Sequence, residues 1–170
     1  MEYFKKARLA TALIAAIGFV SLVMCVPSRH AHAYSEADLT KVMESKQCPG
    51  GDLSNADLKD GGLDEANLRG ANLSGALLKR TSLRGANLEG ADLTGAWMNG
   101  ADLSAANLRN SNLNDAHLDN ANLRGANLGG ADLTGAILGN ANVRGANFKG
   151  ATGLSEEKKE DLEKRGAKVE

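Results

Sequence analysis

Side chains that could act as nucleophiles, general bases or soft metal ligands are scarce in this 170-residue chain, which has three His and two Cys. Beyond residue 33 only His117 and Cys48 remain. A nucleophile–base pair or a zinc site needs several such groups at spacings that bring them together. One His and one Cys cannot supply either arrangement, so we expect no catalytic residue, no metal site and no cofactor.

Carboxylates and glycines are plentiful, but they recur at fixed places in a repeating pattern. Asp stands where a turn is expected, a position that it occupies for backbone reasons. None of the 20 Gly residues belongs to a phosphate-binding loop between a strand and a helix. The formal net charge of −1 argues against a strongly basic nucleic-acid binder and against an acidic solvating tail. We therefore expect a protein that is not an enzyme and does not bind nucleic acid.

Residues 1–33 are typical of an export signal. A basic start is followed by the apolar stretch Leu9–Val26 and by an Ala-His-Ala ending, whose small residues suit a signal peptidase. We expect cleavage between Ala33 and Tyr34, and a mature protein in a periplasm, a lumen or the medium. The alternative is an uncleaved anchor, because about 18 apolar residues approach the length that spans a bilayer. In both cases the chain meets a membrane only through this segment.

Cysteine usage leaves two interpretations of Cys48. Cys25 would leave with the export signal, so Cys48 would be the one thiol of the mature chain. An odd Cys in an oxidising compartment can join two chains. Cys48 therefore either forms an intermolecular disulfide, which would make a dimer, or is a buried, unreactive thiol beside Pro49.

A period of five residues governs the chain from Gly51 to Gly150. Large apolar residues occupy 20 consecutive central positions from Leu53 to Phe148, and 17 of them are Leu. The residue two places earlier is Ala in 16 of the 20 units, the residue just before the centre is Asn or Asp in 14, and 11 units end in Gly. Such self-similarity indicates one small structural unit used repeatedly.

A period of five fits neither an α-helix nor a flat strand. At ~100° per residue, successive Leu side chains would spread around a helix, and on a strand every second Leu would face water. If the backbone instead turns by a quarter circle in each unit, all Leu and Ala side chains point inward. Gly, Asn and Asp suit such corners. Coils of four units then stack at the ~4.8 Å strand spacing, which predicts an all-β solenoid of about five coils.

The A-[DN]-L-x-x pattern of residues 51–150 resembles that of the pentapeptide repeat family. The resemblance implies a right-handed quadrilateral β-helix. Exported members of the family often carry a Cys-x-x-Cys motif just before the first coil. Here Cys48 matches its first position but Gly51 stands at the second, so this chain departs from that motif.

Both flanks of the repeats are predicted to form short helices that cover the ends of the solenoid, because a bare last coil would expose apolar side chains and unpaired backbone. Ser35 is the expected N-cap of the first helix, and Gly166 the expected C-cap of the second. One face of the first helix carries three apolar residues: Leu39, Val42 and Met43. The expected segments are a signal peptide (1–33), a capping helix and turn (34–50), the repeats (51–153) and a C-terminal helical tail (154–170).

Sorting the repeats by 20 residues places every fourth pre-central residue on one face. On one face large side chains replace the usual Asn or Asp: Leu77, Trp97, His117 and Ile137. If they point outward, they form an apolar stripe ~14 Å long. Exposed aromatic residues are enriched at recognition surfaces, so we expect this stripe to dock a partner. The alternative is that these residues pack among themselves or tolerate partial exposure.

Two further columns are basic. They are Arg84, Arg124 and Arg144 on one face, and Arg69, Arg109 and Lys149 on the next. Both could meet an anionic surface, but the acidic residues nearby favour ordinary solvated faces.

A rigid rod filled by its own side chains can present surfaces and little else. We therefore predict an exported, non-catalytic protein-interaction or scaffolding module with an unknown protein partner. The family resemblance implies one alternative, a DNA mimic that binds topoisomerases. DNA mimicry needs a cytosolic location and strongly acidic faces, whereas residues 51–150 hold 9 basic and 11 acidic residues.

Overall fold

The structure is a computed structural model that describes residues 34–170. The predicted export signal, residues 1–33, and the Ala33 side of its cleavage site lie outside the described residues. Within residues 34–170, no helix has the length and apolar character needed to cross a membrane.

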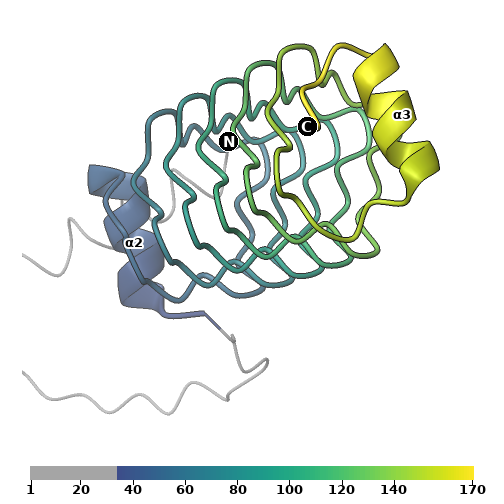
Figure 1. The fold of residues 1–170 in the computed structure, drawn as a ribbon. Coiled ribbons are helices and arrows are strands. Elements are labelled where there is room, and N and C mark those ends of the chain that lie inside the picture. Colours follow the sequence, from purple (N-terminus) through teal and green to yellow (C-terminus); the bar gives the residue numbers. More distant parts are fainter. Residues whose placement is uncertain (1–33) are drawn as a thin grey trace, which may run out of the picture. The chain divides into compact units, whose positions relative to one another are not determined.

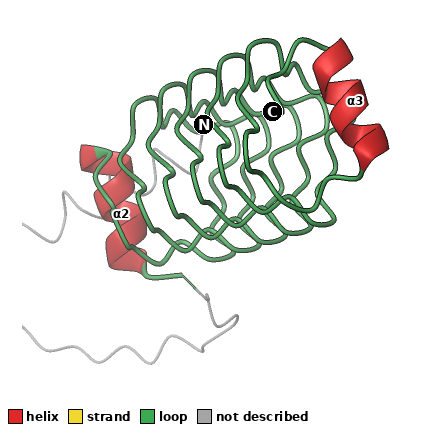
Figure 2. Cartoon of the chain, viewed as in Figure 1, coloured by secondary structure: helices red, strands yellow, loops and turns green. Residues whose placement is uncertain are grey.

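Two α-helices flank a stack of coils. Helix α2 spans Glu36–Ser45 and helix α3 spans Glu156–Lys164, and Figure 1 shows them at opposite ends of the stack. The coils consist of turns and single β-bridges, with no longer strand in the described residues (Figure 2). Only three residues separate successive two-residue turns, so a ladder cannot extend beyond one bridged residue. The predicted β-solenoid is thus held by bridges and not by strands.

Parallel bridges join each pre-central residue from Gln47 to Asp132 to the residue 20 positions further along the chain. One column contains the bridges from Leu77 to Trp97, from Trp97 to His117 and from His117 to Ile137. Around Trp97, its N–H donates to the Ala76 carbonyl at 2.9 Å, and its carbonyl accepts from the Leu78 N–H at 2.8 Å. Four such columns surround the axis. One coil therefore takes 20 residues and has four sides, as the period of five predicts.

Each corner is a tight turn closed by a backbone hydrogen bond. In the first complete unit, the Ala56 N–H donates to the Leu53 carbonyl at 3.1 Å. The residue before it, Asn55, has a φ of 58°, and the last residue of every unit from 55 to 150 likewise has a positive φ. Glycine adopts this conformation without steric cost, and Asn and Asp tolerate it better than other residues. The corner geometry thus explains why Gly ends so many units.

The interior is a continuous column of apolar side chains. Every central residue from Leu53 to Phe148 is buried except Leu138, which is half-buried against the same core. Two polar residues take the small-residue position usually held by Ala, and both are satisfied. The Thr81 hydroxyl donates to the Leu58 carbonyl at 2.8 Å, and the Ser111 hydroxyl donates to the Leu108 carbonyl at 2.8 Å. The core is therefore closed to ligands.

The coil begins one unit earlier than the repeat pattern predicts. Gln47 is bridged to Asn67, and the Cys48 N–H donates to the Asn67 carbonyl at 2.9 Å. Cys48 is fully buried and occupies the central position that Leu holds in later units. The helix and the turn expected in residues 34–50 are present, and residues 47–50 in addition form one side of the first coil. Lys46 ends helix α2 with a φ of 56°, and residues 47–50 then follow the pattern of bridge and turn of a repeat unit, although Gln, Cys and Pro replace its usual residues.

Helix α2 packs on the first coil as its apolar face predicts. The Ser35 hydroxyl accepts a hydrogen bond from the Asp38 N–H at 3.2 Å, which confirms Ser35 as the N-cap. Val42 is fully buried, and Leu39 and Met43 are half-buried against the core.

Helix α3 interrupts the solenoid but does not end it. Leu162 is buried in the core, and after the helix Gly166 has a φ of 86°. The chain then rejoins the stack, where Lys168 is bridged to Asn147 and the Lys168 carbonyl accepts from the Phe148 N–H at 2.7 Å. The predicted helical tail 154–170 is therefore helical only in its middle, and its end continues one side of the coil.

Candidate interaction surface

The four large residues predicted to share a face do lie in one column. We call Leu77, Trp97, His117 and Ile137 the apolar stripe. The exposed fraction is 48% for Trp97 and 44% for Ile137, which are the exposed large hydrophobic residues of the described part. Leu77 and His117 are half-buried. The stripe is thus a surface feature on a rigid backbone, not part of the core.

Part of the stripe packs on itself. The rings of Trp97 and His117 are stacked, with centroids 4.3 Å apart and an interplanar angle of 12°. This distance is close to the ~4.8 Å spacing between strands, so the ladder itself places the rings face to face. His117 therefore covers one face of the indole, while close to half of the Trp97 surface stays open to solvent. Self-packing, the alternative interpretation, accounts for only part of the stripe.

A shallow hollow of about 540 Å³ lies beside Trp97. Its apolar lining residues are Leu77 and Trp97. The rest of the lining consists of the cations Lys59, Lys79 and Arg80 and of Asn99, Gly100 and Asn120. The sequence analysis did not predict this hollow, because on this face it considered only the pre-central residues. Lys79 and Arg80, which follow the central Leu78, are the signal that could have indicated it.

Two of the three cations beside the hollow are already paired. Lys59 Nζ lies 3.1 Å from Asp57 Oδ2. Arg80 makes a two-pronged contact with Asp60, with both nitrogen–oxygen distances at 2.7 Å. The hydrogen bond from Arg80 lowers the pKa of the Asp60 carboxyl below its usual value. Both pairs are solvent-exposed, so they orient the side chains and add little stability.

The far end of the stripe meets helix α3. A second hollow of about 350 Å³ lies beside Ile137. Lys158 Nζ donates to the Ala136 carbonyl at 3.3 Å, and the Arg165 guanidinium donates to the carbonyls of Leu138 and Ala141. These cations replace the backbone N–H groups that a further coil would offer. The carbonyls at this edge are therefore already satisfied.

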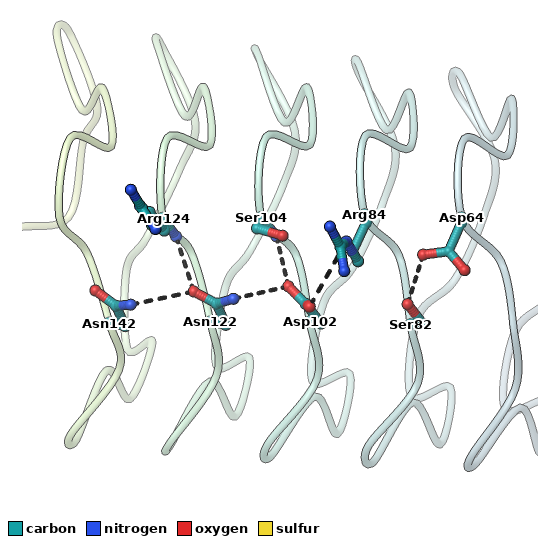
Figure 3. Close-up of polar contacts among 8 residues, drawn as sticks. All are labelled: Asp64, Ser82, Arg84, Asp102, Ser104, Asn122, Arg124 and Asn142. Carbon is teal, nitrogen blue, oxygen red and sulfur yellow. Dashed lines mark hydrogen bonds and ion pairs between the residues drawn. The ribbon is translucent and has the colours of Figure 1, made fainter.

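The other columns bond to themselves. In Figure 3, Asn142 Nδ2 donates to Asn122 Oδ1 at 3.3 Å, and Asn122 Nδ2 donates to Asp102 Oδ1 at 2.9 Å. A column made only of Asn, at residues 67, 87, 107, 127 and 147, behaves in the same way, since Asn107 Nδ2 donates to Asn87 Oδ1 at 3.2 Å. Such ladders satisfy the polar groups of neighbouring coils. Their role is structural, which leaves the apolar stripe as the exception.

The two basic columns are not continuous cationic surfaces. Ser104 separates Arg84 from Arg124, and Arg84 Nε lies 4.0 Å from Asp102 Oδ2 (Figure 3). Arg144 continues this column on the next coil. In the second column, Glu89 and Gly129 alternate with the cations. Those cations are Arg69, Arg109 and Lys149. The geometry therefore presents single charges on solvated faces.

Cys48 is inaccessible from outside. Its side chain has no exposed surface, and its thiol donates to the Asp38 carbonyl at 3.6 Å. Burial, together with the nearby Asp38 carboxylate, raises the pKa of the thiol and so disfavours the reactive thiolate. An intermolecular disulfide at Cys48 would require α2 to leave the first coil. The structure favours the buried, unreactive alternative.

No group of three or more His, Cys, Asp or Glu side chains in residues 34–170 is arranged to hold a metal ion. His117, the one imidazole of this part, is stacked on Trp97. The arrangement can therefore offer an apolar stripe, an adjoining hollow and a cation, which are the components of a docking surface.

Comparison with known proteins assigns the repeats. A family model described as pentapeptide repeats (8 copies) matches residues 63–100, 101–140 and 126–152. No curated protein sequence matches significantly.

Several solved structures are similar to this chain. One is HetL, a pentapeptide repeat protein involved in heterocyst differentiation regulation from the cyanobacterium Nostoc sp. strain PCC 7120, with 33% identity and a TM-score of 0.48; the match covers 62% of this chain and 57% of HetL. Another is a pentapeptide repeat protein from the Arabidopsis thaliana thylakoid lumen, with 33% identity, a TM-score of 0.40, and 73% and 79% of the two chains covered. A third is Rfr23 from the cyanobacterium Cyanothece 51142, with 28% identity, a TM-score of 0.37, and 68% and 97% covered.

This chain spans little more than half the length of HetL. The family model, in contrast, matches more than half of this chain. The matched residues are also those whose pre-central positions stack at 20-residue intervals. On these grounds, the chain belongs to the pentapeptide repeat family.

Proposed function

We propose that this protein is an exported, non-catalytic solenoid that binds a protein partner through the apolar stripe. In this proposal the repeats form a right-handed quadrilateral β-helix of about five coils, and α2 and α3 close its two ends. The single observation that carries the proposal is the replacement of the self-bonding Asn or Asp by large side chains in one column, with Trp97 and Ile137 exposed.

The stripe contributes little that the fold requires. Asn and Asp at equivalent positions of the other columns bond coil to coil and satisfy themselves. The exposed Trp97 and Ile137, which lie on either side of His117 in this column, instead leave apolar area in water, at an unfavourable ~25 cal/mol per Å². Such patches on otherwise polar surfaces mark interaction sites. A docking role explains a feature that stability alone does not.

Affinity capture tests this proposal. The tagged protein would be used to capture binding proteins from the extracytoplasmic fraction of its own cells, beside a Leu77→Asn/Trp97→Asn variant. The matched control is Arg109→Asn/Lys149→Asn, which alters a different face to the same extent. We expect the stripe variant alone to lose the captured partner. Unchanged partners for the stripe variant would contradict the proposal.

Export is tested separately. We expect cell fractionation to place the protein outside the cytoplasm, and intact-mass analysis to find a chain that begins at Tyr34. A protein that retains residues 1–33 in the membrane fraction would indicate an anchor, and a cytosolic protein would refute export.

The DNA-mimic alternative predicts the opposite behaviour. It requires the protein to alter gyrase supercoiling at stoichiometric concentrations. The near balance of 9 basic and 11 acidic residues in residues 51–150 supports the expectation of no such effect. A supercoiling assay with the purified protein distinguishes the two functions.

A further inference from the structure

All the charged side chains that line the hollow beside Trp97 are positive. Its lining includes the cations Lys59, Lys79 and Arg80 and contains no carboxylate. This contrasts with the whole chain, whose formal net charge is −1. The second hollow, beside Ile137, is lined by Asp161 as well as by Lys158 and Arg165. Positive character is therefore a local property of the hollow beside Trp97.

Lys79 supplies most of this local charge. Asp57 lies 3.1 Å from Lys59, and Asp60 holds Arg80 through two contacts of 2.7 Å. Lys79 is exposed and forms no ion pair with any residue of the described range 34–170. Its ammonium group can therefore meet an incoming anion without breaking an existing pair.

The remaining lining residues carry no charge. Leu77 and Trp97 are its apolar members. Gly100 also lines the hollow, and a Cβ added there would lie in ordinary contact with Arg80, 3.7 Å from its Cγ. Asn99 is held in place because its Nδ2 donates to Asp119 Oδ2 at 3.1 Å. The hollow thus offers an apolar contact and a cation side by side on a rigid backbone.

We propose that this hollow binds an acidic, extended segment of the partner protein, with an apolar side chain against Trp97 and Leu77 and a carboxylate on Lys79. The inference rests on the proposed function and specifies the chemistry of the partner. Charge complementarity selects the acid, because the Lys79 ammonium forms no ion pair within residues 34–170 and the lining itself holds no carboxylate. The exposed apolar surface of Trp97 and Leu77 favours a hydrophobic residue next to that acid in the partner's segment.

Two other occupants fit less well. A stable dimer buries about 1,200–2,000 Å² in total, and a stripe of four residues ~14 Å long is small for that area. A nucleic acid strand gains affinity from many phosphate contacts, whereas Lys79 is the one cation of this lining that forms no ion pair within residues 34–170. A short peptide matches both the size and the charge of the site.

The test is a selection of random dodecapeptides displayed on phage against the purified protein, followed by titration of the consensus peptide. Because the chain has one Trp, Trp97 fluorescence reports binding at the hollow directly. We expect enriched peptides to combine acidic residues with an aromatic or aliphatic residue. Lys79→Glu should weaken binding by about tenfold or more, equivalent to ~1.4 kcal/mol, and Lys149→Glu, on another face, should leave it unchanged.

The inference is overturned if no peptide is enriched, if the enriched peptides are basic or neutral, or if Lys79→Glu binds the consensus peptide as well as the unchanged protein does. Equal binding of a single-stranded DNA oligonucleotide would overturn it as well. If neutral peptides are enriched and their binding depends on Trp97, only the acidic character of the partner is refuted, and docking on the stripe stands. Partners that ignore the Leu77→Asn/Trp97→Asn change would refute the proposed function itself.

Discussion

The last residue of each five-residue unit decides which side chains a corner tolerates. All these residues have a positive φ, and in nine units the residue is not Gly. Six of the nine are Asn or Asp, which the left-handed region accepts most readily. The other three are Glu65, Arg80 and Ala105. These three corners hold backbone strain that a Gly would release.

A pair of opposite substitutions tests this strain. Gly90 has a φ of 65° with open space around its missing side chain, so Gly90→Ala changes only the dihedral preference. We expect a loss of about 1 kcal/mol of unfolding free energy. Ala105 has a φ of 57°. We expect Ala105→Gly to raise the unfolding free energy by a similar amount. Chemical denaturation of the two variants measures both, and destabilisation by Ala105→Gly would show that the corners are unstrained.

Gly51 is needed for a different reason, which is close packing. A side chain at this residue would overlap the Cys48 sulfur and approach Asp38 Cγ to 3.2 Å. We expect Gly51→Ala to cost about 1–3 kcal/mol through overpacking. Replacing the sulfur relieves the overlap, so Cys48→Ala should partly rescue Gly51→Ala. A double-mutant cycle by urea denaturation measures the coupling, and simple additivity would contradict this packing.

At the scale of elements, α2 supplies groups that a preceding coil would otherwise provide. In the second coil, the Asn72 N–H donates to the Gly51 carbonyl at 2.9 Å. In the first coil, the equivalent N–H of Asp52 donates to Asp38 Oδ2 at 3.0 Å. This hydrogen bond, with smaller contributions from Ser35 and Cys48, lowers the pKa of the Asp38 carboxyl below its ordinary value.

The lowered pKa predicts how the stability of this end depends on pH. A carboxyl with a depressed folded-state pKa stabilises the fold above its ordinary pKa of about 4, and that stability is lost as pH falls through the depressed value. Asp38→Ala should therefore lower the thermal midpoint at pH 7. The difference from the unchanged protein should shrink as the pH falls below about 4. Thermal melts across this range measure it, and a difference independent of pH would contradict a role for the carboxylate.

At the scale of the whole molecule, the stripe should be separable from the fold. Leu77→Asn/Trp97→Asn puts into this column the side chain that already stacks in another, at Asn87 and Asn107. We expect the unfolding free energy to change by less than about 0.5 kcal/mol, as for ordinary surface changes. Denaturation curves of the variant measure this. A loss of several times that size would mean that the stripe supports the solenoid, and would weaken its assignment to binding.

The 20-residue register was predictable because the period of five leaves no other way to bury every Leu. The stripe was predictable for the same reason, since residues 20 apart must stack. The start of the coil was not, because Cys48 replaces Leu and no Ala precedes it. The C-terminal return was also not predictable. Helix α3 shifts the spacing there, so that Lys168 pairs with Asn147 at 21 residues.

The hollow beside Trp97 depends on side-chain conformations that the repeat pattern does not specify. Lys79 follows an inward-facing Leu, and it lines the hollow together with Trp97, Asn99 and Gly100 of the next coil. The pairing of Arg80 with Asp60 depends on a left-handed φ at both residues. These features require the actual backbone and cannot be obtained from periodicity.

The central claim is that residues 20 apart stack, which places Leu77, Trp97, His117 and Ile137 in one column. Scalar couplings across hydrogen bonds, measured by long-range HNCO spectroscopy, test it most directly. The account predicts couplings from the Trp97 amide nitrogen to the Ala76 carbonyl carbon, and from the Leu118 nitrogen to the Ile137 carbon, for which the structure has N···O distances of 2.9 and 2.8 Å. Couplings to carbonyls four residues earlier, as in an α-helix, would contradict it.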